Sequence, residues 1–159
     1  MDLFNQNEVK AEWLHPTEFP SMKGRDVVAI DLETCDTDLK KMGPGWPRKA
    51  GMVIGIALSS GDFTAYYPIA HEGGGNMDSD VVIKYIKGIC EDESIQKVFH
   101  NAQYDIGWLS VLNIEVKGYI HDTMIAAALL NENRYSFTLN SMVAEYLGEF
   151  KNEALLKAK

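Results

Sequence analysis

The sequence lacks the features that mark several common protein classes. No run approaches the roughly 20 consecutive apolar residues of a membrane-spanning helix, and the first residues have neither the basic nor the apolar region of a secretion signal. The two cysteines, Cys35 and Cys90, lie far apart and form no CxxC or Cys/His cluster, which argues against a zinc site or a disulfide framework. We therefore expect a cytoplasmic protein with reduced thiols and no membrane partner.

Basic residues are also scarce. There are 15 Lys and Arg against 23 Asp and Glu, which gives a net charge of −8 and a pI near 4.9. Broad adhesion to a phosphate backbone depends on Lys and Arg, so any contact with nucleic acid must be small and local. A carboxylate metal site produces an acidic excess, although a solvated acidic surface is the commoner cause.

At 159 residues and 46% hydrophobic content, the chain has the size of one domain. We expect a polar leader over residues 1–25 and a folded domain over 26–159. Apolar, β-branched runs predict strands at Asp26–Glu33, Met52–Leu58 and Phe63–Tyr67, the last two joined by a hairpin turn at 59–62. Residues 34–51 are polar and broken by Gly and Pro, which predicts an exposed loop.

Helical spacing and short apolar runs alternate in the second half of the chain. Short strands are predicted at Lys97–Phe99 and Tyr119–His121, and helices at Asp80–Cys90 capped by Ser79, after Asn101, at Thr123–Leu130, at Leu139–Leu147 and from near Asn152. Three strands followed by alternating helices and strands indicate an α/β layer fold with a mixed sheet.

Two carboxylates stand out on the first predicted strand. Asp31 and Glu33 are two residues apart, so their side chains leave the same face with Cα atoms roughly 7 Å apart. Two such carboxylates can meet one metal cluster, since hard divalent cations prefer oxygen ligands. The alternative is that they only end the strand at its solvated edge.

A second candidate group is His100-Asn101-Ala102-Gln103-Tyr104-Asp105, where a strand ends and a helix begins. Asn101 is a suitable helix N-cap, and Asp105 lies one turn later on the same side. A capped helix with an acidic first turn is the alternative. Asp122, at a later strand end, is interpreted as an N-cap or as a hydrogen-bond acceptor that supports the site, in preference to a metal ligand.

The loop KKMGPGWPRK places Trp46 among basic residues that include Lys49. Phosphate-binding charge beside a stacking surface suggests a grip on single-stranded DNA. We favour slightly the alternative, a solvated basic loop whose tryptophan packs on the domain. The glycines at 73–75 lack the lysine and the context of a phosphate-binding loop.

Taken in order, DLET, HNAQYD, HDTMIAAALLN and LNSMVAEYLG resemble the DnaQ-like, ribonuclease H-like 3′–5′ exonuclease domain of family-A DNA polymerases, over about Asp26 to Gly148. The resemblance implies a three-layer fold and a proofreading nuclease that hydrolyses 3′-terminal nucleotides of single-stranded DNA. It also implies two divalent metal ions, Mg²⁺ or Mn²⁺, at Asp31, Glu33 and Asp105, with Leu32, Thr34, Asn101 and Tyr104 near the terminal nucleotide. A polymerase domain would follow C-terminally, in a bacterial or phage-infected cell.

The family's third motif, a Tyr or His followed four residues later by Asp, is not found, since no aspartate follows Asp122. We expect truncation before this motif, with one or more C-terminal helices missing and activity weak or absent. Ribonuclease D has much of the same pattern, so an RNA 3′ exonuclease stays open. A catalytically silent exonuclease-like scaffold or single-strand-binding domain is the other alternative.

Overall fold

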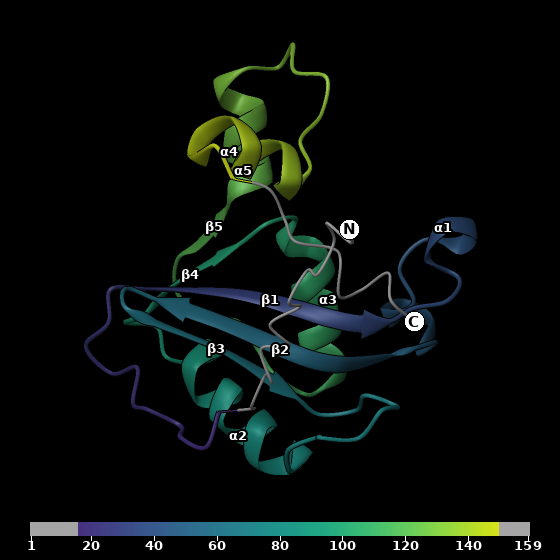
Figure 1. Cartoon of the computed structure of the whole chain (residues 1–159), viewed down its shortest axis with the longest axis vertical. Helices are drawn as coiled ribbons and strands as arrows, with labels where there is room; N and C mark the ends of the chain where they lie inside the picture. Colours follow the sequence, from purple (N-terminus) through teal and green to yellow (C-terminus); the bar gives the residue numbers. More distant parts are fainter. Residues whose placement is uncertain (1–15, 150–159) are drawn as a thin grey trace, which may run out of the picture.

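The computed structural model describes residues 16–149, and they form a five-stranded mixed sheet with helices around it (Figure 1). The strand order is β3-β2-β1-β4-β5, antiparallel from β3 to β1 and parallel from β1 to β5. The strands are β1 (Val27–Cys35), β2 (Met52–Ser60), β3 (Phe63–Pro68), β4 (Gln96–Phe99) and β5 (Ile120–Asp122). The predicted α/β fold with a mixed sheet is confirmed.

The two faces of β1 have different environments, as alternation along a strand requires. Val28, Ile30 and Leu32 are buried on one face. The helices α2 (Ser79–Cys90) and α3 (Ala102–Val111) contribute the other half of this core, chiefly through Ile86 and Trp108, which are both fully buried. The odd-numbered residues of β1 therefore lie on the opposite face of the sheet.

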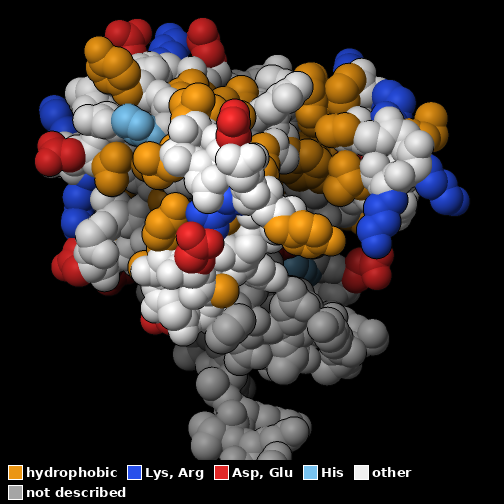
Figure 2. Space-filling model, turned by 90° about the horizontal axis from the view of Figure 1, so that it is seen from above, with side chains coloured by type: hydrophobic (Ala, Val, Ile, Leu, Met, Phe, Trp, Pro, Cys, Tyr) orange, Lys and Arg blue, Asp and Glu red, His pale blue; other side chains and the backbone are white. Residues whose placement is uncertain are grey.

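Two later helices lie away from that core. Helices α4 (Thr123–Leu130) and α5 (Leu139–Leu147) stand together beyond β5, at the top of Figure 1, with the bounds predicted from the sequence. Gly148, with φ 69°, ends α5 as expected. Figure 2 shows this end from above, with hydrophobic side chains spread across it and Lys and Arg on both sides, including the side where α1 lies.

Several local predictions need correction. The hairpin turn is shorter than expected, because Ser59 and Ser60 belong to β2 and Ser60 pairs with Phe63. The cap of α2 is Asp78, whose carboxylate accepts hydrogen bonds from the backbone of Asp80 and Val81, and not Ser79. The predicted loop 34–51 contains two short helices, α1 (Leu39–Met42) and η1 (Trp46–Arg48).

The helix predicted from near Asn152 lies outside the described residues, as does most of the predicted leader. Within residues 16–149, each helix is too short or too polar to cross a membrane.

Candidate active site

Strand β1 presents Asp31 and Glu33 on the face opposite the α2–α3 core. Asp31 is exposed and pairs with Ala57 of β2, while Glu33 is half-buried and pairs with Gly55. Both partners on β2 are small, so nothing bulky at these two positions separates the carboxylates from β3. The expected placement of both carboxylates on one face follows from their spacing and the observed register.

Asp105 reaches the same region from a different element. The pairing of β1 with β4 ends at Ala29 and Val98, and α3 begins shortly after β4. The backbone N–H of Leu32, beyond that last pair, donates to Asp105 Oδ1 over 3.1 Å. The first turn of α3 thus lies alongside the part of β1 that β4 leaves uncovered.

Burial and charge both act on Asp105. The residue is 3% exposed, and burial raises its pKa from an ordinary 3.8 to about 7, with the neighbouring Asp31 carboxylate as the next cause. The hydrogen bond from Leu32 opposes this rise. A buried carboxyl group that is held beside another carboxylate favours either a proton or a cation.

Asp122 organises the start of α3 as well as that of α4. Its carboxylate accepts hydrogen bonds from the N–H groups of Asn101 (3.1 Å) and Ala102 (2.8 Å), and from those of Met124 (2.9 Å) and Ile125 (3.3 Å). Burial alone would raise the pKa of Asp122, but these four bonds together lower it. The sequence interpretation of Asp122 as an N-cap is confirmed for α4.

Asn101 does not cap α3 with its side chain, contrary to the sequence prediction. It is exposed and left-handed, with φ 69° and ψ 55°, and its amide makes no capping hydrogen bond. Asp122, 21 residues away, takes over that role for α3. A left-handed conformation is one that Asn tolerates better than most residues.

Tyr104 connects α3 to the end of β1. Its hydroxyl lies 2.7 Å from the Thr34 hydroxyl and donates to Asp36 Oδ2 over 3.4 Å. Asp36 in turn accepts a hydrogen bond from Gly45 N over 2.8 Å, which ties the loop 36–51 to this edge. Sequence reasoning missed Asp36, since no motif includes it and its partners are distant in sequence.

The indole of Trp46 packs on α3. A Cβ on Gly107 would come within 2.3 Å of the indole, so the ring lies directly against this glycine. The Arg48 guanidinium donates to the carbonyls of Met42, Gly43 and Pro44 and so folds the loop, while Lys49 is exposed. This packing favours the structural alternative, and contact of Trp46 and Lys49 with DNA stays a prediction.

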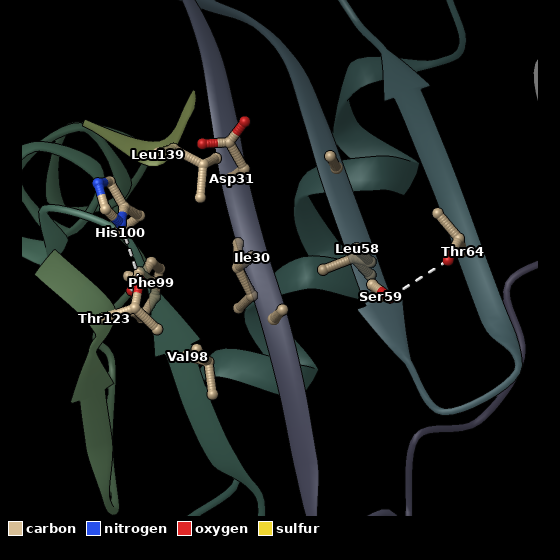
Figure 3. A pocket seen from close by; sticks show the side chains of 12 residues that line it. Ile30, Asp31, Leu58, Ser59, Thr64, Val98, Phe99, His100, Thr123 and Leu139 are labelled. Atoms are coloured by element: carbon tan, nitrogen blue, oxygen red, sulfur yellow. Dashed lines mark hydrogen bonds between the residues drawn. The ribbon is translucent and has the colours of Figure 1, made fainter. Parts of the chain in front are cut away.

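A pocket of about 270 Å³ opens beside Asp31, between β1, β2, β4 and the start of α4 (Figure 3). Its lining is largely hydrocarbon, and Asp31 is the only carboxylate in it. His100 is fixed at its side by Thr123, 2.9 Å from Nδ1, and by the Phe137 carbonyl, 2.9 Å from Nε2. Glu33 and Asp105 do not line this pocket, so ionic chemistry would take place at its rim.

The donor set fits a hard divalent cation in chemical type, because Asp31, Glu33 and Asp105 offer only carboxylate oxygens. Their side chains do not form a finished cage, since no three His, Cys, Asp or Glu side chains of residues 16–149 gather around one point suited to a metal ion. An ion at this site would have to draw the carboxylates together. Burial first, and the Asp31 carboxylate second, raise the pKa of Asp105, and a bound cation would offset both effects.

Comparisons with known proteins agree on the type of domain. The profile of a family described as "3′–5′ exonuclease" matches residues 17–158. A DNA-directed DNA polymerase of Pseudomonas phage M6 is 35% identical over 156 residues, covering 94% of this chain and 24% of the phage protein. DNA polymerase I of Pseudomonas aeruginosa is 29% identical over 130 residues, covering 77% of this chain and 13% of that protein.

Solved structures resemble the fold at lower identity. Escherichia coli RNase D superposes with a TM-score of 0.61 at 23% identity, covering 85% of this chain and 31% of that one. Brucella melitensis NrnC with bound Mg²⁺ gives 0.58 at 23% identity, covering 84% and 60%. The chain spans about a quarter or less of the length of the two polymerases above.

Proposed function

This chain belongs to the 3′–5′ exonuclease family, as a domain related to those of DNA polymerase I, and we propose that it removes 3′-terminal nucleotides from single-stranded DNA. The relatives are DNA polymerases, so the activity would serve proofreading beside a polymerase domain. The observation that carries the proposal is the approach of buried Asp105 to the strand that bears Asp31 and Glu33.

The three carboxylates would hold two Mg²⁺ or Mn²⁺ ions. When bound, such ions would supply an activated water and stabilise the departing 3′ oxygen in an in-line displacement. Asp31 and Glu33 contribute from one strand face, and Asp105 contributes from the helix that lies beside it. Asp122 fixes the start of that helix through Asn101 and Ala102, so it positions Asp105 without being a ligand.

The terminal nucleotide would lie at the end of β1. Tyr104, which is tied to Thr34, and the backbone of Leu32 and Thr34 border this region together with exposed Asn101. The hydrocarbon pocket beside Asp31 is lined by no Lys or Arg, and His100 is its only basic lining residue. Recognition of the sugar and base, and not broad attraction of the backbone, would therefore dominate binding, in keeping with the acidic chain.

Calorimetric titration of Mn²⁺ into the parent chain, Asp31→Ala and Asp80→Ala tests the metal site. Asp80 is an exposed carboxylate in the first turn of α2, on a different element, so its loss should leave binding unchanged. We expect Asp31→Ala to lose binding. Equal isotherms for the parent and Asp31→Ala would refute the assignment of the site.

Release of nucleotides from 5′-labelled single-stranded DNA and RNA of the same sequence tests the substrate. We expect slow release from DNA in Mn²⁺, because no Tyr-xxx-Asp or His-xxx-Asp follows Asp122 in this sequence, and none from Asp31→Ala. Faster release from RNA would instead favour the ribonuclease alternative.

The proposed DNA contact of the loop is tested by comparing the parent with a Trp46→Ala, Lys49→Ala double variant. Equal affinity of the two proteins for single-stranded DNA would refute this contact.

A further inference from the structure

Tyr66 of β3 lies on the carboxylate face of the sheet, although no motif pointed to it. In the observed register Asp31 pairs with Ala57, and Ala57 pairs with Tyr66, so the three side chains share one face. The hydroxyl of Tyr66 extends over Gly55, where a Cβ would come within 1.8 Å of it. Gly55 is thus the residue that makes room for this hydroxyl.

Gly55 is also the direct partner of Glu33. Cβ positions of directly opposite residues in an antiparallel pair lie about 5 Å apart on the same face. A hydroxyl at the Cβ position of Gly55 is consequently about that far from the Cβ of Glu33, within reach of the Glu33 carboxylate. Burial, with smaller contributions from the nearby Glu33 and Asp31 carboxylates, raises the pKa of Tyr66 to about 12.

His71 holds the Tyr66 hydroxyl from the other side. Its Nε2 lies 2.5 Å from Tyr66 Oη, and the two rings meet edge to face with centroids 5.8 Å apart. The backbone of His71 is itself fixed, because its N–H donates to Asn76 Oδ1 over 2.7 Å and its carbonyl accepts from Asn76 Nδ2 over 2.8 Å. These two hydrogen bonds to Asn76 close the loop that follows β3.

We propose that Tyr66, oriented by His71, is a positioning residue that directs the Glu33 carboxylate toward the metal of the exonuclease site. The proposal takes His71 Nε2–H as the donor in its hydrogen bond with Tyr66 Oη, so that the Tyr66 hydroxyl proton is directed to Glu33. The inference rests on the proposed function, since it takes Glu33 to be a metal ligand. Groups that hydrogen-bond to metal-ligating side chains fix their orientation, and their removal commonly weakens metal binding by about 10–100-fold.

Mn²⁺ titrations of Tyr66→Phe and Tyr67→Phe provide a matched comparison. Each variant loses one hydroxyl from β3, but Tyr67 points to the opposite face, where it is fully buried and donates to the Glu18 carbonyl over 3.4 Å. We expect Tyr66→Phe to bind Mn²⁺ about 10-fold more weakly with an unchanged melting temperature, and Tyr67→Phe to bind like the parent. Tyr66→Phe binding like the parent would overturn the inference.

The Asp31→Ala chain separates this failure from that of the proposed function. Loss of binding in Asp31→Ala with normal binding in Tyr66→Phe would remove only the role of Tyr66. Unchanged binding in Asp31→Ala would remove both, because no metal would then be held at these carboxylates.

A double-mutant cycle tests the link between Tyr66 and His71. We expect His71→Ala to weaken Mn²⁺ binding by itself, and to add nothing in a chain that already carries Tyr66→Phe, because both act through one hydroxyl. Gly55→Ala should also weaken Mn²⁺ binding, since its Cβ displaces that hydroxyl. Additive losses for Tyr66→Phe and His71→Ala would contradict the proposed chain of contacts.

Discussion

Asp105→Asn should stabilise the metal-free protein, and should do so more strongly as the pH rises. The folded-state pKa of Asp105, about 7, lies above the ordinary 3.8. Between these two values the folded chain holds a proton on Asp105 that the unfolded chain has released. The free energy of unfolding therefore falls as the pH rises from about 4 to 7. Asn carries no charge, and its Oδ1 can still accept the Leu32 N–H.

The magnitude follows from the two pKa values. One pKa unit corresponds to about 1.4 kcal/mol, so the raised pKa of Asp105 lowers the free energy of unfolding by about 1.7 kcal/mol at pH 5 and about 4 kcal/mol at pH 8. The stability gap between Asp105→Asn and the parent should thus widen by about 2.5 kcal/mol over this range. For a chain of this size the widening corresponds to roughly 5–10 °C in melting temperature.

Thermal melts at pH 5, 6, 7 and 8 in a chelator measure this gap. Asp62→Asn is the control, because Asp62 is exposed and its hydrogen bond with Arg25 lowers its pKa, so its charge does not change in this range. Adding Mn²⁺ at pH 8 should stabilise the parent and not Asp105→Asn. A gap between Asp105→Asn and the parent that stays constant with pH would refute the reasoning.

Three further substitutions test contacts that hold the fold together. Asp122→Ala removes the acceptor of four backbone N–H groups and should cost about 2–4 kcal/mol in urea unfolding at pH 7. Because the pKa of Asp122 is lowered, this loss should shrink as the pH falls below about 4. Lys97→Met should cost about 1–3 kcal/mol by urea unfolding, since the buried Lys97 ammonium donates to the Asp92 and Lys117 carbonyls. Gly107→Ala should displace the Trp46 indole, costing about 1–3 kcal/mol with a red-shifted tryptophan emission, whereas Gly88→Ala on α2 has open space and should not.

Local patterns in the sequence were sufficient for most elements. Alternating and β-branched residues predicted β1 and the β2–β3 hairpin, and the bounds of α4 and α5 were predicted correctly. These signals work because strand and helix periods and glycine stops act within a few residues. Caps were predicted less well, since Asp78 competes with the adjacent Ser79 for one role and Asp122 caps α3 from 20 residues away.

The sequence by itself determined that Asp31 and Glu33 share a face, because residues two apart on any strand do so. Only the tertiary structure decided what lies beside them. Asp105 approaches Leu32 because β4 ends early and leaves the backbone of β1 open to α3. Tyr66 reaches the carboxylates because the hairpin register places a glycine, Gly55, under its hydroxyl. Neither contact has a local signal, since each depends on where strands pair and end.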